Sequence, residues 1–585
     1  FCFFSFLVTS SFTLSTASFL SSLSTSKSGD EIITIMKKKI FAPLFFLSLS
    51  ASTFGLTEQY TKSTGDLTDP TIWSTGTAPT FGNTSYLDKS GEYTIGGDIN
   101  TAVFGTNWGS RQQTVRMVDS NGFEITDPAK FYTFTVDGGS ETGTLIRLRS
   151  NSGTSTEENR LTFLNGNYVF KTDSSEIKFT TEENTISGDI VSGIVKVVEF
   201  GENTVVSAIK NTFISGRNKE LYRQSNYVLN GTFNAFDGTS YKQLAVAYTC
   251  AEVGGNLNIG KLALWGGSDF RIAASGVVAC NNDHVSVEDG AKLTVDGSLS
   301  GNSIDIQANS GGFIVSSTGR VNALAFNNRA SNSIVEQGGI INAEAVYAYG
   351  GLLTINGTVA QSVSENISQN ILIDSAAAVK VSSTGKLSAK GGYGNIHIDG
   401  VLDISGGKNS VITSGNWGLR IRDGGRLILR STDAISNSET GEQSNYVFWA
   451  YSGNTFIDIL ADNSFNSFAM VKKSNLTVTI GADVNLVTIR KFISQLDSNC
   501  IDGLADETAK LTLVGFKENT IRVLEAPGEA DKNADGFLAI YADGWKDFYI
   551  DENGYLAATP VPEPAGFAVI LGVVSLYCMV RRRRS

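Results

Sequence analysis

The chain has 585 residues, a formal net charge of −12 and only 18% charged residues. Residues 1–55 contribute +2 and the four terminal arginines contribute +4, which leaves −18 for the rest of the chain. Because an acidic surface repels phosphate groups, this balance argues against a DNA- or RNA-binding protein. The aromatic content of 10% argues against a disordered chain.

Glycine is abundant, with 61 residues, whereas proline is scarce, with 8. No proline occurs between Pro128 and Pro527. Since proline cannot donate a hydrogen bond to a β-ladder, its absence over this length favours long stretches of paired strands. The length alone would suggest about four domains of roughly 150 residues, but solenoids and other large all-β units do not follow that rule.

The N-terminal region has the organisation of an export signal. Residues 1–35 begin with Phe and form a Phe/Ser/Thr-rich stretch, and Met36 is then followed by three lysines, the apolar run 40–49 and small residues up to Gly55. A basic segment, an apolar segment and small residues, in this order, are typical of a secretory signal peptide. We therefore expect a signal peptide at residues 36–55 and a non-native upstream extension at residues 1–35. A longer, unusual leader is the alternative.

The segment 60–128 alternates turn clusters with short apolar runs. It places Gly65, Trp73, Gly76 and Pro79 in an arrangement similar to the opening strand motif of autotransporter-like β-helical proteins. In such a body the tryptophan would cover the first layer, whose sheet ends would otherwise expose apolar side chains and open hydrogen bonds. We expect Trp73 to be this plug.

Strand signals continue through residues 131–236, and between residues 253 and 429 they become a repeat. Each unit has a glycine before a short strand in which apolar and polar residues alternate, as at Gly290, Gly319 and Gly351. The number of residues between successive units varies. Such turn-and-strand units suit a β-solenoid, in which each coil hydrogen-bonds to the next and buries its inward row of side chains.

These observations predict an all-β protein in which residues 56–430 form a right-handed parallel β-helix, that is, a β-solenoid. Tandem antiparallel β-sandwiches are the alternative fold. After residue 430 the composition shifts to aromatic and Asn residues, a short helix is expected at residues 487–496, and further strands follow. Residues 431–560 are therefore predicted to be a C-terminal β-rich cap over the last coil.

Three of the five cysteines lie between the predicted signal peptide and the C-terminal segment, namely Cys250 and Cys280 in the predicted solenoid and Cys500 in the predicted cap. A disulfide between Cys250 and Cys280 could join neighbouring layers of the solenoid, and the alternative is two small core side chains. The sequence has no CxxC motif and no Cys/His spacing typical of a metal site. We expect no cofactor.

The chain has only two histidines, and one of them lies in an alternating segment. Asn395, His397 and Asp399 alternate with isoleucines, so they should point outward along one strand, where a β-helical lyase or glycosidase could place an acid/base group. A polar outer face is the preferred interpretation, and we predict no catalytic residues. Four aromatic residues could either stack on sugar rings or fill the interior, namely Trp265, Tyr347, Tyr349 and Trp417.

Asp531, Asn533 and Asp535 have the spacing that opens a calcium loop of the EF-hand kind. The later ligand positions are Ala539 and Ala542, which offer no side-chain oxygen. A plain acidic turn before a strand is therefore the preferred interpretation of this weak calcium candidate.

The C-terminal segment 561–585 combines a Pro-Glu-Pro motif, an uncharged apolar run and an arginine cluster. The residues in question are Val561, Pro562, Glu563, Pro564, the run 565–580, Arg581, Arg582, Arg583 and Arg584. The run is just below the roughly 17 to 25 residues of a membrane-spanning helix, so flanking residues must help it to span. Since the arginines should stay in the cytoplasm, everything before Pro562 should lie outside. We expect a single transmembrane helix within residues 561–585.

This tail resembles the PEP-CTERM sorting signal of exported bacterial proteins, and the resemblance covers residues 561–585 alone. It implies an exosortase-type membrane protease that recognises Pro562-Glu563-Pro564 and removes the tail. An anchor that is never cut is the alternative. The resemblance also implies a Gram-negative-type bacterium that makes exopolysaccharide.

We therefore expect an exported, non-enzymatic structural or adhesive protein of the cell surface or extracellular matrix. Its partners would be the processing protease, the membrane before cleavage, and exopolysaccharide or other matrix components. A carbohydrate-active β-helix enzyme is the alternative. An autotransporter-like adhesin is a third class, but its chain should end in amphipathic strands, whereas this one ends in an arginine-rich tail.

Overall fold

The computed structural model describes most of the chain after residue 55. The described residues are 56–106, 112–150, 159–183, 196–216, 225–281, 283–361, 371–389, 396–413, 418–436, 447–493, 498–501, 508–525, 540–561, 573–577, 579, 581 and 582. Contacts divide the chain into two compact units, Phe1–Leu56 and Thr57–Ser585, and every described strand belongs to the second unit.

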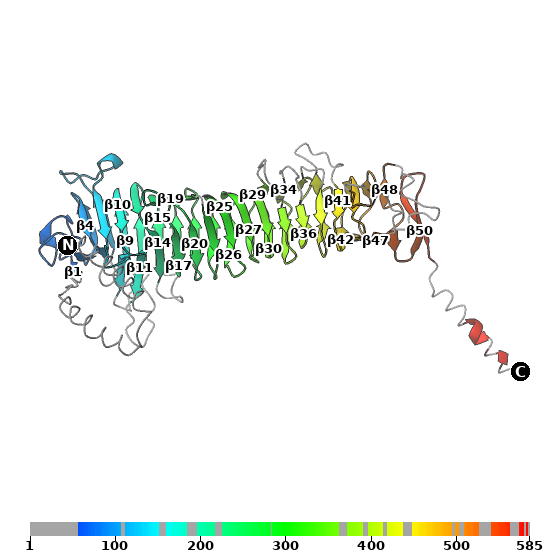
Figure 1. Ribbon diagram of the computed structural model, residues 1–585, viewed down its shortest axis with the longest axis horizontal. Coiled ribbons are helices and arrows are strands. Elements are labelled where there is room, and N and C mark those ends of the chain that lie inside the picture. Colours follow the sequence, from blue (N-terminus) through cyan, green and yellow to red (C-terminus); the bar gives the residue numbers. More distant parts are fainter. Residues whose placement is uncertain are drawn as a thin grey trace, which may run out of the picture. The chain divides into compact units, whose positions relative to one another are not determined.

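The second unit is a parallel β-helix. Its strands do not pair with their neighbours in sequence but with the equivalent strand of the next coil, as β2 (Asn83–Leu87) does with β5 (Val103–Thr106) and β5 with β8 (Thr144–Ser150). In Figure 1 the colours, which follow the sequence, pass in order from blue through green to orange along the stack of strands. Since β-sandwiches are built from antiparallel sheets, the parallel pairing excludes the alternative of tandem sandwiches.

Each coil has three faces, which the chain visits in the order first, second, third. The first face contains β1 Thr57–Tyr60, β2, β5, β8, β11 Glu176–Glu183, β14 Asn211–Gly216, β17 Leu244–Ala247, β20 Leu262–Trp265, β23 His284–Val287, β32 Ile371–Ile373, β35 Ile396–Ile398, β38 Leu419–Ile421, β41 Val447–Ala450 and β44 Ser467–Met470. The second face contains β3 Gly91–Ile95, β6 Gln112–Met117, β9 Asn159–Leu164, β12 Lys196–Phe200, β15 Ser225–Leu229, β18 Cys250–Val253, β21 Asp269–Ile272, β24 Lys292–Val295, β26 Gly312–Val315, β28 Ser333–Val335, β30 Gly351–Ile355, β33 Ala377–Val381, β36 Val401–Ile404, β39 Arg426–Leu429, β42 Asn454–Ile459, β45 Asn475–Ile480, β47 Lys510–Val514 and β49 Ile540–Ala542. The third face contains β4 Ile99–Thr101, β7 Thr133–Asp137, β10 Gly166–Lys171, β13 Thr204–Ala208, β16 Thr232–Ala235, β19 Asn256–Ile259, β22 Val277–Cys280, β31 Thr358–Gln361, β34 Lys386–Ala389, β37 Val411–Thr413 and β40 Ile435–Ser436.

The remaining elements connect or close these faces. Three long strands run from the third face to the first without a break, namely β25 Ser298–Ile306, β27 Arg320–Asn328 and β29 Ile340–Ala348. A separate three-stranded parallel sheet is formed by β43 Asn463–Phe465, β46 Val487–Ile489 and β48 Ile521–Val523. Two short 3-10 helices, η1 Pro70–Ile72 and η2 Pro128–Lys130, each begin after an aspartate whose side chain accepts a backbone hydrogen bond.

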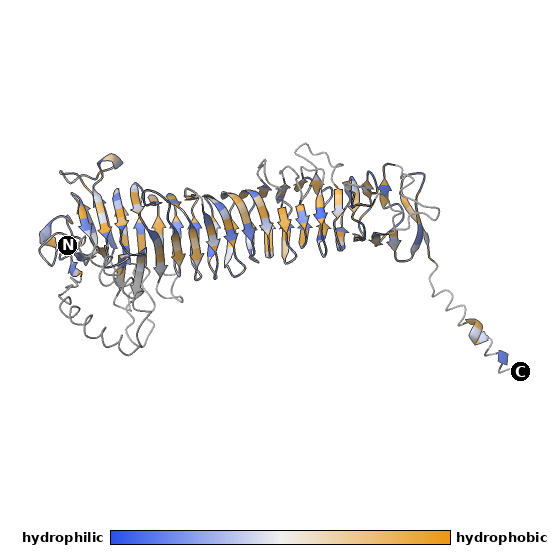
Figure 2. Ribbon diagram, in the orientation of Figure 1, coloured by the Kyte–Doolittle hydropathy of each residue, from blue (hydrophilic) through white to orange (hydrophobic). Residues whose placement is uncertain are grey.

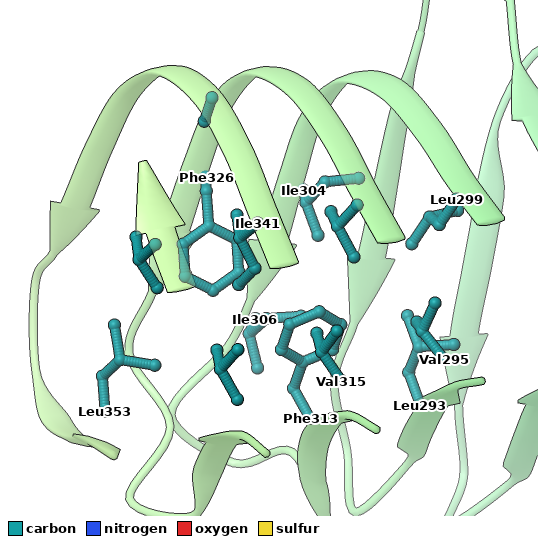
Figure 3. Packing of buried hydrophobic residues seen from close by; sticks show 14 of the residues in the cluster. Leu293, Val295, Leu299, Ile304, Ile306, Phe313, Val315, Phe326, Ile341 and Leu353 are labelled. Atoms are coloured by element: carbon teal, nitrogen blue, oxygen red, sulfur yellow. The ribbon is translucent and has the colours of Figure 1, made fainter. Parts of the chain in front are cut away.

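The interior is filled by inward rows of apolar side chains. On the second face Val295, Val315, Val335 and Ile355 pair from coil to coil at a constant sequence interval, and all four are fully buried. Figure 3 shows Val295 and Val315 pointing toward side chains from the long strands, and Figure 2 shows the matching alternation of hydrophobic and hydrophilic residues along the strands. This alternation is the sequence pattern that predicted the solenoid.

Glycine precedes many strands because the chain passes very close to the preceding coil at these corners. A Cβ atom added at Gly319, Gly385 or Gly425 would lie 2.1, 2.0 or 2.1 Å from a backbone carbonyl oxygen of that coil. No side chain fits into such a gap, whatever the backbone conformation. The glycines recur in the sequence because each such corner lies in close contact with the preceding coil.

The first coils have an aromatic core. Phe163 stacks on Phe200 with ring centroids 5.0 Å apart, and it contacts Tyr168 at 4.9 Å. Trp73 is fully buried beside the first strand and donates its indole N–H to the carbonyl of Leu67 at 3.0 Å. The burial of Trp73 agrees with its expected place as a plug on the first layer.

Two expectations about the C-terminal part were wrong. The ladder of the second face does not stop at residue 430 but continues from β39 through β42, β45 and β47 to β49. Val487–Ile489 is the strand β46 rather than the start of a helix, because it completes the sheet with β43 and β48. Only β50 (Trp545–Ile550) and β51 (Leu556–Pro560) change to antiparallel pairing and close the described part of the ladder.

Candidate functional site

The outer side of the first face carries the candidate residues. Ile396 and Ile398 are fully buried, so the half-buried His397 between them points to the outside, as expected from the alternation of a strand. His397 pairs in register with Arg420 of the next coil, which pairs with Trp449 of the coil after it. Asp399, Arg422 and Tyr451 follow two positions later, directly after the ends of β35, β38 and β41.

We name the resulting surface the aromatic–arginine strip. It consists of Arg329, Tyr347, Tyr349, His397, Asp399, Arg420, Arg422, Trp449 and Tyr451. The strip begins after β27 and ends after β41, so residues from distant parts of the sequence lie on successive coils of one face.

Arginine side chains lie over aromatic rings along the strip. The rings of Tyr347 and Tyr349 stack with centroids 5.4 Å apart, and the guanidinium of Arg329 lies 4.7 Å from the Tyr349 centroid. The guanidinium of Arg420 lies 4.2 Å from the ring of Trp449 and 5.2 Å from that of Tyr451. Each such contact attracts the cation to the negative face of the ring.

Asp399 and His397 occupy different electrostatic environments. Arg422 donates two hydrogen bonds to the two carboxylate oxygens of Asp399, so this carboxylate is held in a bidentate ion pair. Burial and the nearby Arg420 and Arg422 lower the pKa of His397 to about 4, although Asp399 acts in the opposite direction. His397 is therefore neutral near pH 7.

The C-terminal end of the strip is partly covered. Trp449 is 1% exposed and packs with Ala469 and Cys500 in a small apolar cluster outside the main core. Cys500 forms an antiparallel bridge with Val471, which brings its segment across this face. Tyr451 is 40% exposed and is thus the most accessible ring at this end of the strip.

The other aromatic candidates are distributed along the same face or cannot be placed. Trp265 stacks on Phe213, two coils earlier, with centroids 5.5 Å apart. Trp417 and Asn395 lie outside the described residues. Sequence reasoning found His397, Asp399 and the two tyrosines but missed the three arginines, Trp449 and Tyr451.

Carboxylates that are near each other in sequence do not converge. Asp399 lies on the first face, whereas Asp403 lies on β36 of the second face and pairs with Arg430 at 2.7 Å. Asp296 pairs with Arg271 at 2.6 Å. Among the described residues, no group of three or more His, Cys, Asp or Glu side chains is arranged to hold a metal ion. The calcium candidates Asp531, Asn533 and Asp535 lie outside the described residues.

The structure does not form the disulfide that was considered between Cys250 and Cys280. Cys250 is half-buried on the outer side of β18, whereas Cys280 is buried on the inner side of β22, on a different face. Cys280 is a free thiol, and burial raises its pKa to about 12. The two side chains therefore lie on opposite sides of the wall of the solenoid.

A groove of about 350 Å³ lies on the outer side of the second face, in the coils from β9 to β21. Its polar lining includes Arg160, Asn226, Cys250, Glu252, Asp269 and Arg271. Ion pairs join Arg160 to Glu199 at 2.5 Å and Arg271 to Glu252 at 3.3 Å. Sequence reasoning missed this groove because its residues come from separate coils.

The described chain is fixed to the body up to the start of the tail. The backbone N–H of Val561 donates to the carbonyl of Gly544 at 2.8 Å, directly after the end of β51. Pro562, Glu563, Pro564, Arg583 and Arg584 lie outside the described residues, whereas Arg581 and Arg582 are helical, as are residues 573–577 and 579. In the part of the chain that the structure describes, no helix has the length and apolar character needed to cross a membrane.

Comparison with known proteins adds no assignment: no protein family matches the chain, and none of the curated proteins matches it significantly.

Proposed function

We propose that the protein is an exported structural or adhesive component of the cell surface or extracellular matrix, sorted and cleaved through its PEP-CTERM-like tail. The order of motif, apolar run and arginines supports a single membrane helix that an exosortase-type protease removes.

We also propose a right-handed winding of the coils, because parallel strands joined by a crossover are nearly always connected that way. The segment after β49 serves as the cap.

The observation that carries a scaffold role is the pairing of charges between coils. Acidic side chains on the outer faces pair with cations of neighbouring coils, as in Glu199–Arg160, Glu252–Arg271, Asp399–Arg422, Asp403–Arg430 and Asp458–Arg426. A carboxylate held by an arginine is a poor general acid or base, since the ion pair stabilises its charged form. These groups link coils, which is what a structural rod requires.

The test is the intact mass and cellular location of the protein in its native host. The wild type should appear outside the cell without its tail, whereas a variant with Pro562, Glu563 and Pro564 replaced by alanine should stay in the membrane at full length. The matched control replaces Pro527 and Glu529 by alanine, another Pro/Glu pair in the sequence, and should be processed like the wild type. If wild type and variant both stay uncut in the membrane, the sorting proposal is wrong.

A carbohydrate-active enzyme is the second candidate, favoured by the position of His397 and Asp399 beside three arginines on one outer face. The ion pair of Asp399 and the lowered pKa of His397 favour the scaffold over this candidate. Incubation with acidic and neutral polysaccharides, followed by an assay for new reducing ends, decides between them. Activity that is lost in His397→Gln and Asp399→Asn would support the enzyme.

A further inference from the structure

We propose that the aromatic–arginine strip binds an anionic polysaccharide of the polyuronate class, with the sugar chain running parallel to the axis of the solenoid. This inference rests on the proposed function only in taking matrix polysaccharide as the partner. The site itself is defined by the contacts of the strip.

The spacing of the coils suits an extended sugar chain. Four coil-to-coil pairings lead from β29 through β32, β35 and β38 to β41. Because neighbouring strands lie about 4.8 Å apart, these four steps span about 19 Å. One pyranose unit of an extended polysaccharide has a length close to one coil step, so successive sugars would meet equivalent positions on successive coils.

The side chains offer both kinds of contact that a uronate requires. Aromatic rings provide apolar surface for the C–H face of a sugar, and Tyr347, Tyr349 and Tyr451 are half-buried or exposed. A guanidinium that lies over a ring directs its N–H groups sideways, in its own plane, where a carboxylate can accept them. Arg329 and Arg420 have this arrangement at the two ends of the strip.

The charge of the strip differs from that of the whole chain. The strip has three positive side chains, Arg329, Arg420 and Arg422, and two negative ones are nearby, Asp399 within the strip and the neighbouring Asp374. By contrast, residues 56–580 together have a net charge of −18. His397 adds no positive charge near pH 7 because its pKa is about 4. On an acidic surface, a local excess of arginine selects the place at which an anionic chain can approach.

Affinity electrophoresis of the full chain in gels that contain polygalacturonate provides the test. We expect Arg329→Gln and Tyr451→Ala each to weaken binding by about tenfold, the effect of losing one charge-assisted hydrogen bond or one well-packed contact. Two variants are used because they change opposite ends of the strip, and an unchanged melting temperature shows that each is folded. Binding should also weaken with added salt.

The matched control is Tyr541→Ala. Tyr541 is 49% exposed and lies 4.5 Å from the ammonium of Lys510, so it forms a cation–π pair of the same kind on the second face. This variant should bind like the wild type. Wild-type affinity in both strip variants, an equal loss in Tyr541→Ala, or equal binding of a neutral glucan would overturn the proposal. A tail variant that is not cleaved should still bind, which separates this result from the sorting test.

Discussion

His397 is held in a position that disfavours its charged form. Its pKa is lowered from 6.5 to about 4 by burial, with Arg420 and Arg422 contributing, while Asp399 partly opposes them. Between these two pH values the unfolded chain binds a proton that the folded chain does not. The contribution of His397 to the free energy of unfolding is therefore constant above about pH 6.5 and becomes increasingly unfavourable as the pH falls toward 4.

We expect His397→Leu to lose less stability on acidification than the wild type, because leucine cannot bind a proton. Leucine should be accommodated at this position, since Leu372 already occupies the same outward row on the preceding coil. Melting temperatures of both proteins between pH 7 and pH 4 measure this difference. The only other histidine, His284, forms a contact of 2.6 Å with Asp283, and His284→Gln serves as the control. Parallel pH profiles of the wild type and His397→Leu would contradict the assignment.

The aromatic core of the first coils should be the most sensitive to truncation. Phe163 is fully buried against Phe200 and Tyr168, and Phe163→Ala is expected to lower the free energy of unfolding by about 3–5 kcal/mol. Phe123 is 71% exposed, so Phe123→Ala should change it by less than about 0.5 kcal/mol. Chemical denaturation of both variants checks the contrast, which equal effects would refute.

At the scale of elements, the coil is the unit of construction. Deleting residues 316–335 removes one complete coil between the equivalent positions Val315 and Val335. The joined chain keeps every inward row in register, so we expect a folded β-rich protein with a cooperative melting transition. Circular dichroism and thermal melting test this expectation.

The control for the coil deletion removes half a coil, residues 316–325. This deletion places the second-face sequence at the position of another face and disrupts the inward rows, so the variant should aggregate or lose its cooperative transition. A half-coil deletion as stable as the whole-coil deletion would show that register between coils is unimportant.

The sequence predicted the coil because its signals are local. Glycine corners such as Gly319 and alternating strands such as Lys292–Val295 are visible within a few residues. The predicted boundary at residue 430 was wrong because aromatic side chains such as Phe448 and Phe465 fill the interior there, as aliphatic side chains do in the middle coils. The composition changes at this point, but the fold does not.

The candidate site was only half predictable for a related reason. Alternation within one strand was enough to place His397 and Asp399 outside. Their neighbours Arg420 and Trp449 follow at unequal intervals along the sequence, because the connections between coils differ in length. Register across such connections is set by backbone pairing, which no local pattern in one sequence reveals.

At the scale of the second unit, the last strands protect the edge of the second-face ladder. β50 and β51 turn antiparallel, and Trp545 and Phe548 pack on Phe516 with centroids 5.4 and 5.3 Å away. An uncovered edge of a long sheet readily pairs with another copy.

We expect a chain that ends at Gly544, and therefore lacks β50 and β51, to self-associate with increasing concentration. Light scattering after size-exclusion chromatography measures the mass of the particles. The control ends at Val561, keeps both strands, and should show a mass that does not change with concentration. If the two truncated chains behave alike, β50 and β51 do not guard the edge.

The constant interval between Val295, Val315, Val335 and Ile355 in the middle coils also has an evolutionary meaning. A short in-frame duplication or loss within the gene adds or removes a whole coil without requiring a new interface, since each coil already fits its copy. The length of the solenoid can thus change from one lineage to another while the capping strands β50 and β51 remain as they are.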